Sequence, residues 1–248
     1  MNYYIFEALK NRFIISENKI DYLSMIKLMN DNNCDGYIIY KNYPLEMKIY
    51  NKDGSKATMC GNGLRCFLLY GIMFHNLSNK FYNVKVNNKK IKCEIINTYP
   101  FFCKLTLSPE KKLPIKKKVF FYKGKMISLY TIFLGTLSHV LFYDEEINIK
   151  EIIRYIKRDL KLKNGNISFV KIINNHEMEV ITHERGVGFT KSCGTGNAAC
   201  FYIMHNLKLL NNEATIINKG GKMSLRFINN NVEIYGSAFL EKEMTIWK

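Results

Sequence analysis

The sequence predicts two structurally similar α/β domains, joined by a short linker, and three observations carry this prediction. Short runs with the alternation and the β-branched or aromatic residues of strands occur throughout both halves. Each half also has one stretch with helical spacing, then a Cys-Gly-x-Gly turn and an apolar run, with the turns at 60–63 and 193–196. Two prolines and a lysine cluster interrupt the pattern at 108–118. We therefore predict a duplicated unit whose two copies have diverged in sequence.

The first half is predicted to contain strands at YYIFEAL, NRFIISE, GYIIYK, EMKIYN, NVKVNN, IKCEII and FFCKLTLS. Residues 21–31 have apolar side chains at helical spacing, and the core contacts expected from this helix are Leu23, Ile26, Leu28 and Met29. A buried helix is predicted at 65–77, where an apolar run follows the first glycine-rich turn.

The second half repeats this plan. Strands are predicted at KVFFYK, MISLYTIFL, HVLFYD, ISFVKIIN, EMEVITH, ATIINK, MSLRFIN and VEIYGSAFL. A helix at about 148–160 corresponds to the early helix of the first half, and the apolar run ACFYIMHNLKLL follows the second glycine-rich turn. We place the first domain at 1–113 and the second at 114–239, with a last strand at about 240–248 that returns to the first domain.

Composition and charge narrow the class of protein. With 248 residues, 47% of them hydrophobic, the chain can bury one large core or two ordinary ones. The net charge of +16 comes from scattered lysines without zinc-finger spacing or an RNP-like signature, so we expect a solvated surface and no nucleic-acid partner. The alternative is a basic nucleic-acid-binding module, which a salt-dependent gel shift would reveal. The sequence has no long apolar run and no signal-peptide pattern, which predicts a cytoplasmic protein without a membrane partner.

The cysteines are seven in number, and they form no Cys-x-x-Cys pair. An odd count without a secretion signal argues against a disulfide framework, and the spacing argues against a closed zinc site, so we predict no metal. The cysteines expected to be structural are Cys34, Cys66, Cys93, Cys103 and Cys200.

The two Cys-Gly-x-Gly turns predict a chemistry. Glycines allow close approach of a ligand, and a helix start offers unpaired N–H groups that bind a carboxylate and stabilise a thiolate. Cys60 and Cys193 are therefore expected to have pKa values below the free value of about 8.5. Facing turns would hold one amino-acid carboxylate and place one sulfur on each side of its α-carbon. One thiolate then removes the α-proton and the other thiol delivers one, so no cofactor is predicted.

The blocks NKDGSKATMCGNGLRCF at 51–67 and HERGVGFTKSCGTGNAAC at 183–200 resemble the diaminopimelate epimerase family. Weaker agreement runs through most of the chain, including NGNISFV at 164–170 and GGKMSLRF at 220–227. The resemblance implies two pseudo-symmetric domains, each a strongly curved sheet around a central helix, with the active site in the cleft between them. It implies interconversion of LL- and meso-diaminopimelate, on the route to lysine and peptidoglycan.

The resemblance also implies roles for individual residues. Cys60 and Cys193 would be the acid/base pair. Backbone groups of four residues would hold the carboxylate at the reacting carbon: Gly61, Asn62, Gly194 and Thr195. The far end of the substrate would be held by Asn51, Asn166, Glu184 and Arg185, since Arg suits a carboxylate and Glu an ammonium group. Asn11 is the further substrate-binding residue that the family pattern retains. The alternatives are that Glu184 and Arg185 form a structural ion pair and that Asn51 sets its own turn.

Two elements depart from the family pattern. The opening His-Gly-x-Gly-Asn-Asp-Phe is EALKNRF at 7–13, with Arg12 at the Asp position. The Gly-Asn-Pro-His element is GTLSH at 135–139, so Leu137 replaces an Asn while His139 remains. These changes leave open a racemase for another amino acid, such as histidine. An isomerase of the phenazine or proline-racemase type is disfavoured, because both cysteines are present. The expected partner is a small-molecule amino-acid substrate, and a homodimer is left open.

Overall fold

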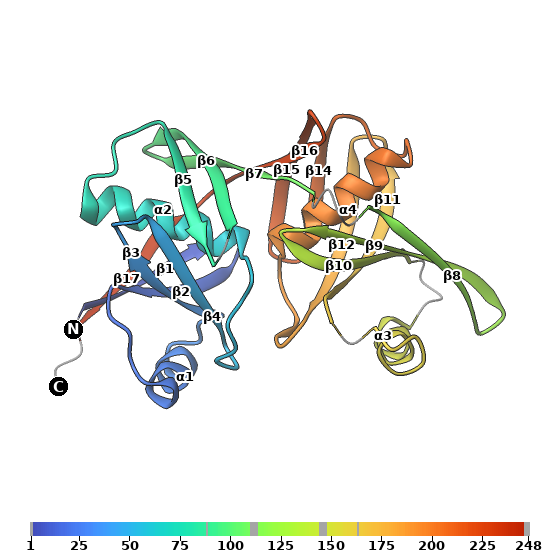
Figure 1. Cartoon of the computed structure of the whole chain (residues 1–248), viewed down its shortest axis with the longest axis horizontal. Coiled ribbons are helices and arrows are strands. Elements are labelled where there is room, and N and C mark those ends of the chain that lie inside the picture. Colours follow the sequence, from blue (N-terminus) through green and yellow to red (C-terminus); the bar gives the residue numbers. More distant parts are fainter. Residues whose placement is uncertain (1, 88, 110–113, 144–147, 163, 246–248) are drawn as a thin grey trace. The chain divides into compact units, whose positions relative to one another are not determined.

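The computed structural model of the protein describes residues 2–87, 89–109, 114–143, 148–162 and 164–245 (Figure 1). The chain forms two compact units, with Met1–Thr106 and Glu233–Lys248 in unit 1 and Leu107–Val232 in unit 2. Part of the predicted linker, residues 110–113, lies outside the described residues, as do residues 246–248 of the predicted last strand. The lysines at 116–118 begin a strand rather than extending the linker.

Unit 1 is a sheet interrupted by two helices, α1 (Tyr22–Asp31) and α2 (Gly61–His75). Its strands are β1 (Asn2–Ala8), β2 (Asn11–Ser16), β3 (Gly36–Lys41), β4 (Glu46–Asn51), β5 (Phe81–Val86), β6 (Lys89–Thr98), β7 (Phe101–Leu107) and β17 (Phe239–Thr245). β1 pairs antiparallel with both β17 and β2. α1 connects β2 to its parallel neighbour β3, and β4 pairs antiparallel with β3. α2 then leads to the parallel pair β4–β5, which β6 and β7 extend antiparallel.

Unit 2 repeats this order with α3 (Ile149–Arg158) and α4 (Gly194–Asn206). Its strands are β8 (Lys116–Tyr122), β9 (Lys125–Leu134), β10 (Thr136–Phe142), β11 (Asn166–Asn174), β12 (Glu177–Glu184), β13 (Gly188–Phe189), β14 (Glu213–Asn218) and β15 (Gly221–Ile228). β16 (Asn231–Ser237) follows, and its residues from Glu233 onward belong to unit 1. β10 and β11 are parallel neighbours connected by α3, and β12 and β14 are parallel neighbours connected by α4. The neighbouring pairs β8–β9, β9–β10, β11–β12 and β14–β15 are antiparallel. The equal pairing order confirms the predicted duplication.

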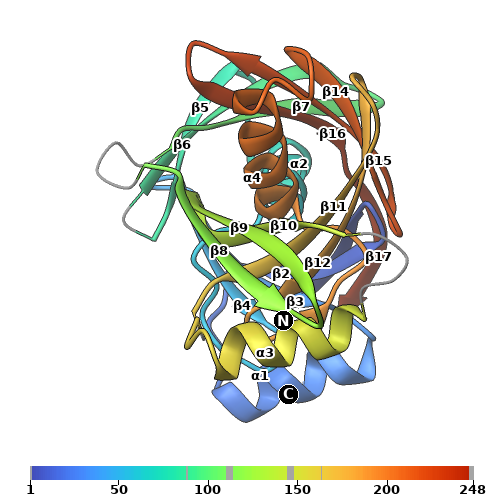
Figure 2. The same ribbon diagram turned by 90° about the vertical axis from the view of Figure 1, so that its right-hand side faces the viewer.

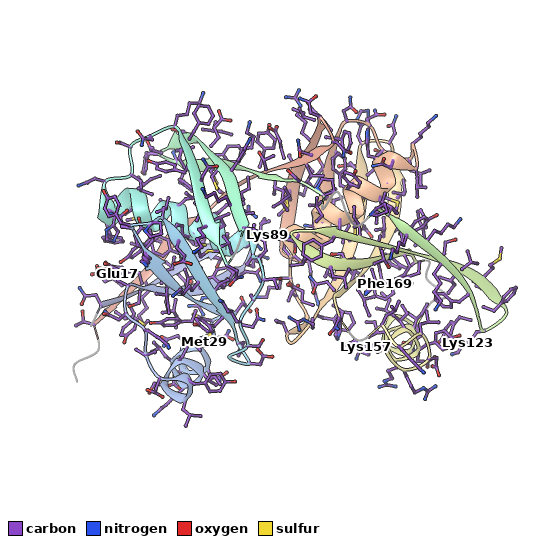
Figure 3. All side chains as sticks on the ribbon, in the orientation of Figure 1. Glu17, Met29, Lys89, Lys123, Lys157 and Phe169 are labelled. Atoms are coloured by element: carbon purple, nitrogen blue, oxygen red, sulfur yellow. The ribbon has the colours of Figure 1, made fainter. Side chains whose placement is uncertain are left out.

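The two helices of each unit differ in burial because they lie on opposite faces of the curved sheet. α2 is buried throughout 61–71 and α4 throughout 194–204, as expected of a helix that the sheet surrounds (Figures 1 and 2). α1 and α3 bury one side only. Met29 of α1 packs in a cluster with residues of β1, β2 and β3, and Phe169 of β11 packs in the cluster under α3 (Figure 3).

Three details of the predicted elements are wrong. Leu23 is 75% exposed, because the buried side of α1 is set by Met25 and Met29, four residues apart. The helix predicted at 65–77 begins earlier, at Gly61, since Cys60 caps it. The single strand predicted at 232–240 is two strands, β16 and β17. Among the described residues, no helix has both the length and the apolar character needed to cross a membrane.

Candidate active site

The first Cys-Gly-x-Gly turn joins β4 to α2, and Cys60 is the N-cap of that helix. Its backbone is extended (φ −146°, ψ 111°), and its Sγ accepts a hydrogen bond from the Gly63 amide at 3.3 Å. A Cβ on Gly63 would come within 2.9 Å of Ile49 Cδ1 and 3.1 Å of Ile38 Cδ1, so the helix start packs directly on the sheet. Glycine at this position lets the helix start lie close against the sheet.

The second turn has the same construction in unit 2. Cys193 is the N-cap of α4 (φ −122°, ψ 106°), and its Sγ accepts from the Gly196 amide at 3.4 Å. A Cβ on Gly196 would lie 2.9 Å from Thr182 Oγ1 and 3.2 Å from Ser168 Oγ. Each unit thus holds one thiol at the N-terminus of its buried helix, where the helix dipole and the first N–H groups favour a negative charge.

The other five cysteines have a different environment, although all seven are free thiols. Burial raises the pKa of Cys34, Cys103 and Cys200 to about 12 and raises the pKa of Cys66 and Cys93 strongly as well. These thiols stay protonated and act as small apolar side chains. Cys60 and Cys193 are the thiols that occupy helix N-caps, which separates them physically from the rest.

A chain of amide hydrogen bonds joins two of the predicted binding residues in unit 1. Asn62, which is buried, donates its Nδ2 to Asn11 Oδ1 at 2.6 Å. Asn11 in turn donates to Asp35 Oδ2 at 3.5 Å. Arg65, one helical turn after Asn62, donates to Asn62 Oδ1. The helix start of α2 and the beginning of β2 are thereby held in one polar network.

Asn51 is the last residue of β4, and its side-chain hydrogen bond lies within the turn that follows. Its Nδ2 donates to Ser55 Oγ at 3.0 Å, and its amide N–H donates to the Ser55 carbonyl at 2.8 Å. Asp53 Oδ1 accepts from both the amide and the hydroxyl of Ser55. The structure therefore gives Asn51 the turn-setting contacts that are the alternative to substrate binding.

The predicted residues of unit 2 lie around Cys193. Asn166 donates its Nδ2 to Cys193 Sγ at 3.6 Å and accepts the Arg185 amide N–H on its Oδ1 at 3.0 Å. The Thr195 hydroxyl also lies 3.6 Å from Cys193 Sγ. Beside this cluster, Glu184 accepts the Thr190 hydroxyl at 2.7 Å, while Arg185 is exposed.

The two elements that depart from the family pattern have structural partners of their own. His139 is 2% exposed, and its ring nitrogens lie 2.9 Å from Thr131 Oγ1 and 2.8 Å from the Asn164 carbonyl. Burial lowers the pKa of His139, so a neutral imidazole that donates to Asn164 and accepts from Thr131 fits these contacts. Arg12 forms a bidentate pair with Glu241 of β17, at 2.7 Å for both bonds.

The sequence predicts no role for Arg65 or Asp35, but the structure joins them to the predicted binding residues Asn62 and Asn11. A signal was present for one of them, because Arg65 is a charged residue inside an otherwise apolar helical run. Asp35 carries no such signal. Within the described residues, no group of three or more His, Cys, Asp or Glu side chains is placed to hold a metal ion.

Comparisons with known proteins identify one family model, curated relatives and similar solved structures. Residues 138–238 match the family model for diaminopimelate epimerase. The chain is 30% identical over 261 residues to diaminopimelate epimerase of Clostridium perfringens, covering 96% of this chain and 92% of that protein. It is 26% identical over 270 residues to the Prochlorococcus marinus enzyme of the same name, covering 94% of each. The fold is similar to a crystal structure of a hydroxyproline epimerase from Agrobacterium vitis, with a TM-score of 0.75, 10% identity, and coverage of 99% and 90%.

Proposed function

The chain belongs to the diaminopimelate epimerase family and is an epimerase, and from that premise we propose that it inverts the α-carbon of diaminopimelate, between the LL and meso forms, with Cys60 and Cys193 as the two bases. The observation that carries the proposal is the matched pair of sulfurs. Each caps a buried helix, and each accepts the amide three residues further along, from Gly63 in one unit and Gly196 in the other.

The chemistry follows from what a helix start can stabilise. The α-carboxylate binds the first N–H groups of α2 and α4, those of Gly61 and Gly194 followed by Asn62 and Thr195. One thiolate removes the α-proton, and negative charge then moves onto that carboxylate, where the two helix dipoles stabilise it. The other sulfur, as a thiol, protonates the opposite face. In the reverse direction the two sulfurs exchange roles, so the enzyme needs no pyridoxal phosphate.

A racemase for a different amino acid, such as histidine, is the second candidate, and two observations favour it. The Asn51 amide is engaged by Ser55, and Leu137 is apolar where the family pattern has an amide. Both features reduce the number of polar contacts available to the second ammonium and carboxylate groups of diaminopimelate. Glu184 and Arg185 argue for diaminopimelate, because together they offer partners for exactly those two groups.

Proton exchange at the α-carbon in D₂O distinguishes these candidates. The enzyme is incubated with LL-diaminopimelate, meso-diaminopimelate, L-histidine and a panel of other free amino acids, and deuterium incorporation is measured by NMR. We expect exchange with inversion for diaminopimelate. Exchange confined to histidine or another amino acid would replace the substrate while leaving the two-base chemistry intact.

Two matched pairs of variants test the bases. Cys60→Ala and Cys193→Ala are expected to lose turnover by a factor of about a thousand or more, while Cys66→Ala and Cys200→Ala, on the same two helices, retain it. Circular dichroism checks that all four variants are folded. Near-full turnover in folded Cys60→Ala or Cys193→Ala would exclude that sulfur as a base.

A further inference from the structure

Asn166 is the first residue of β11, and its side-chain amide lies between the Cys193 sulfur and the backbone that follows β12. Asn166 is 7% exposed and Cys193 is 5% exposed, so both groups are shielded from bulk water. Asn166 Nδ2 lies 3.6 Å from Cys193 Sγ, and its Oδ1 lies 3.0 Å from the amide nitrogen of Arg185. The family resemblance implies a contact between Asn166 and the substrate, but the structure shows a contact with a sulfur.

The Arg185 N–H determines which end of the Asn166 amide faces the sulfur. A backbone N–H can only donate, so the amide oxygen must face it. Nδ2 is then the end that faces Cys193 Sγ, and this NH₂ group cannot accept a proton from a thiol. A thiol sulfur is a weak acceptor, whereas a thiolate forms a charge-assisted hydrogen bond with such a donor. The contact therefore favours the ionised form of Cys193.

The Thr195 hydroxyl is placed to act in the same way. Its Oγ1 lies 3.6 Å from Cys193 Sγ, and it accepts a hydrogen bond from the Thr136 hydroxyl at 3.0 Å. Because Thr136 supplies the proton in that bond, the proton of Thr195 is left to donate to the sulfur. Thr136 is the first residue of β10, so β10 and β11 each begin with a side chain that serves this helix start.

With the N-cap bond from the Gly196 amide at 3.4 Å, the Cys193 sulfur has three donors around it. Donors that are already in place stabilise a negative charge without reorganising when the charge forms. Their hydrogen bonds are also stronger in a buried site than in water. Cys200, further along the same helix, shows what burial does to a thiol, since burial raises its pKa to about 12. Fixed donors are therefore what a buried sulfur needs in order to ionise.

Several titratable side chains occur on the segments around this helix start. They are His139, His183, Glu184, Arg185, Lys191, Cys200 and Lys219. Arg185 and Lys191 are exposed, so solvent screens their charges. Burial lowers the pKa of both histidines, which are therefore neutral at neutral pH. All of these groups are kept in the variants below, so a change in the ionisation of Cys193 reports the side chain that is substituted.

We propose that Asn166 and Thr195 are positioning residues whose side chains hold Cys193 in its thiolate form. This inference rests on the proposed function, which makes Cys193 one of the two bases. When Cys193 takes the α-proton, an S–H bond forms, the C–H bond breaks and its electron pair stays on the substrate. The Thr195 hydroxyl can then turn and accept from the new S–H, whereas the Asn166 amide cannot. Asn166 thus favours the state of Cys193 that is ready to remove a proton.

Ultraviolet titration of the substrate-free, full-length protein tests the inference, because a thiolate absorbs where a thiol does not. The Cys60→Ala variant is the background, so that Cys193 is its remaining helix-capping thiol. The double variant Cys60→Ala/Cys193→Ala is the blank. The other five cysteines stay protonated from about pH 5 to 10, because burial raises their pKa. The difference between the two titrations therefore gives the midpoint for Cys193.

Four substitutions in this background separate the two donors from their surroundings. Asn166→Leu and Thr195→Val each remove one donor without adding a charge, and each should raise the Cys193 midpoint by about one pH unit. Thr195→Ser keeps the hydroxyl and should retain the original midpoint. Ser138→Ala is the matched control, because Ser138 is a buried neighbour in register with Asn166. Its hydroxyl has no hydrogen-bond partner in the described part of the chain, so its removal should leave the midpoint in place.

Circular dichroism checks that each variant is folded, and the two donors are tested separately in case one substitution prevents folding. An unmoved midpoint in folded Asn166→Leu or Thr195→Val would overturn the inference, and so would an equal rise in Ser138→Ala. If Asn166 only bound substrate, Asn166→Leu would raise KM and leave the substrate-free midpoint unchanged. The titration needs no turnover, so a fully active Cys193→Ala enzyme would instead refute the proposed function and leave the titration result standing.

Discussion

The last residue of each Cys-Gly-x-Gly turn offers a matched test of how the sheets position the sulfurs. Gly63→Ala and Gly196→Ala add the same methyl group at equivalent positions, but the new Cβ atoms meet different neighbours. At Gly63 these are the terminal Cδ1 atoms of Ile38 and Ile49, at 3.1 and 2.9 Å. At Gly196 they are the hydroxyls of Thr182 and Ser168, which are 3.0 Å apart and bonded to each other.

The expected changes in the free energy of unfolding differ between the two variants. The ends of the isoleucine side chains can move aside, whereas the two hydroxyls cannot move apart without losing their hydrogen bond. Alanine for glycine at a helical position gains about 0.5–1 kcal/mol. Shifting two flexible methyl groups costs about the same, so Gly63→Ala should be within about 0.5 kcal/mol of the wild type. Gly196→Ala adds overpacking of about 1–3 kcal/mol and the loss of a buried hydrogen bond, about 1–3 kcal/mol. With the gain from alanine subtracted, a net loss of at least about 1 kcal/mol follows.

Thermal unfolding and epimerisation kinetics check this prediction together. For a chain of this size, about 1 kcal/mol corresponds to a fall in Tm of about 2–4 °C. Gly196→Ala should therefore lower Tm by at least that much, while Gly63→Ala should change it little. Since the Gly196 amide donates to Cys193 Sγ, kcat/KM should also fall by about tenfold or more in Gly196→Ala only. Equal effects of the two substitutions, or a larger effect at Gly63, would refute the reasoning.

Three further predictions concern stability. Lys104 bonds Glu94 at 2.7 Å and holds the pKa of that carboxyl below its usual value. The wild type should therefore lose stability as pH falls below about 4.3. In urea titrations, the free energy of unfolding of Lys104→Met should depend less steeply on pH over this range. Burial lowers the pKa of His139, so its contribution to stability is present above about pH 6.5 and is lost on acidification. If the slope of the unfolding free energy against pH is the same in His139→Gln as in the wild type, this prediction is wrong. Lys10 has a positive φ of 59° in the β1–β2 turn, and Lys10→Gly should raise the free energy of unfolding by about 0.5–1 kcal/mol; a lower Tm would exclude strain there.

The local part of the fold could be predicted from the sequence because it depends on short-range periodicity. GYIIYK and EMKIYN are strands β3 and β4 at the predicted residues, since alternation and β-branched residues are sufficient for a strand within a sheet. The duplication followed from two cysteine–glycine turns that fill equivalent places. The exposure of Leu23 could not be predicted from the sequence. Helical spacing shows that α1 has apolar side chains on one side, but it does not say which of two neighbouring rows of side chains faces the sheet.

The polar network of unit 1 could not be predicted, because it depends on tertiary packing. The bond between Asn62 and Asn11 joins residues 51 positions apart, and it forms only once the start of α2 lies over β2. Likewise, a charge at position 65 is visible in the sequence, but the glycine that accommodates it is on β16. The family pattern indicated that Asn11 and Asn62 matter, and the structure supplies the contacts that orient them.

The return of the last strands to unit 1 has a consequence for how the protein is made. Residues 107–232 form one uninterrupted stretch, so unit 2 can fold as soon as that stretch leaves the ribosome. Unit 1 begins earlier but must wait, because β17 pairs with β1 and Gly236 covers Arg65. The half of the enzyme translated first is thus the half completed last, and until β17 is made the edge of β1 stays unpaired and open to pairing with another chain.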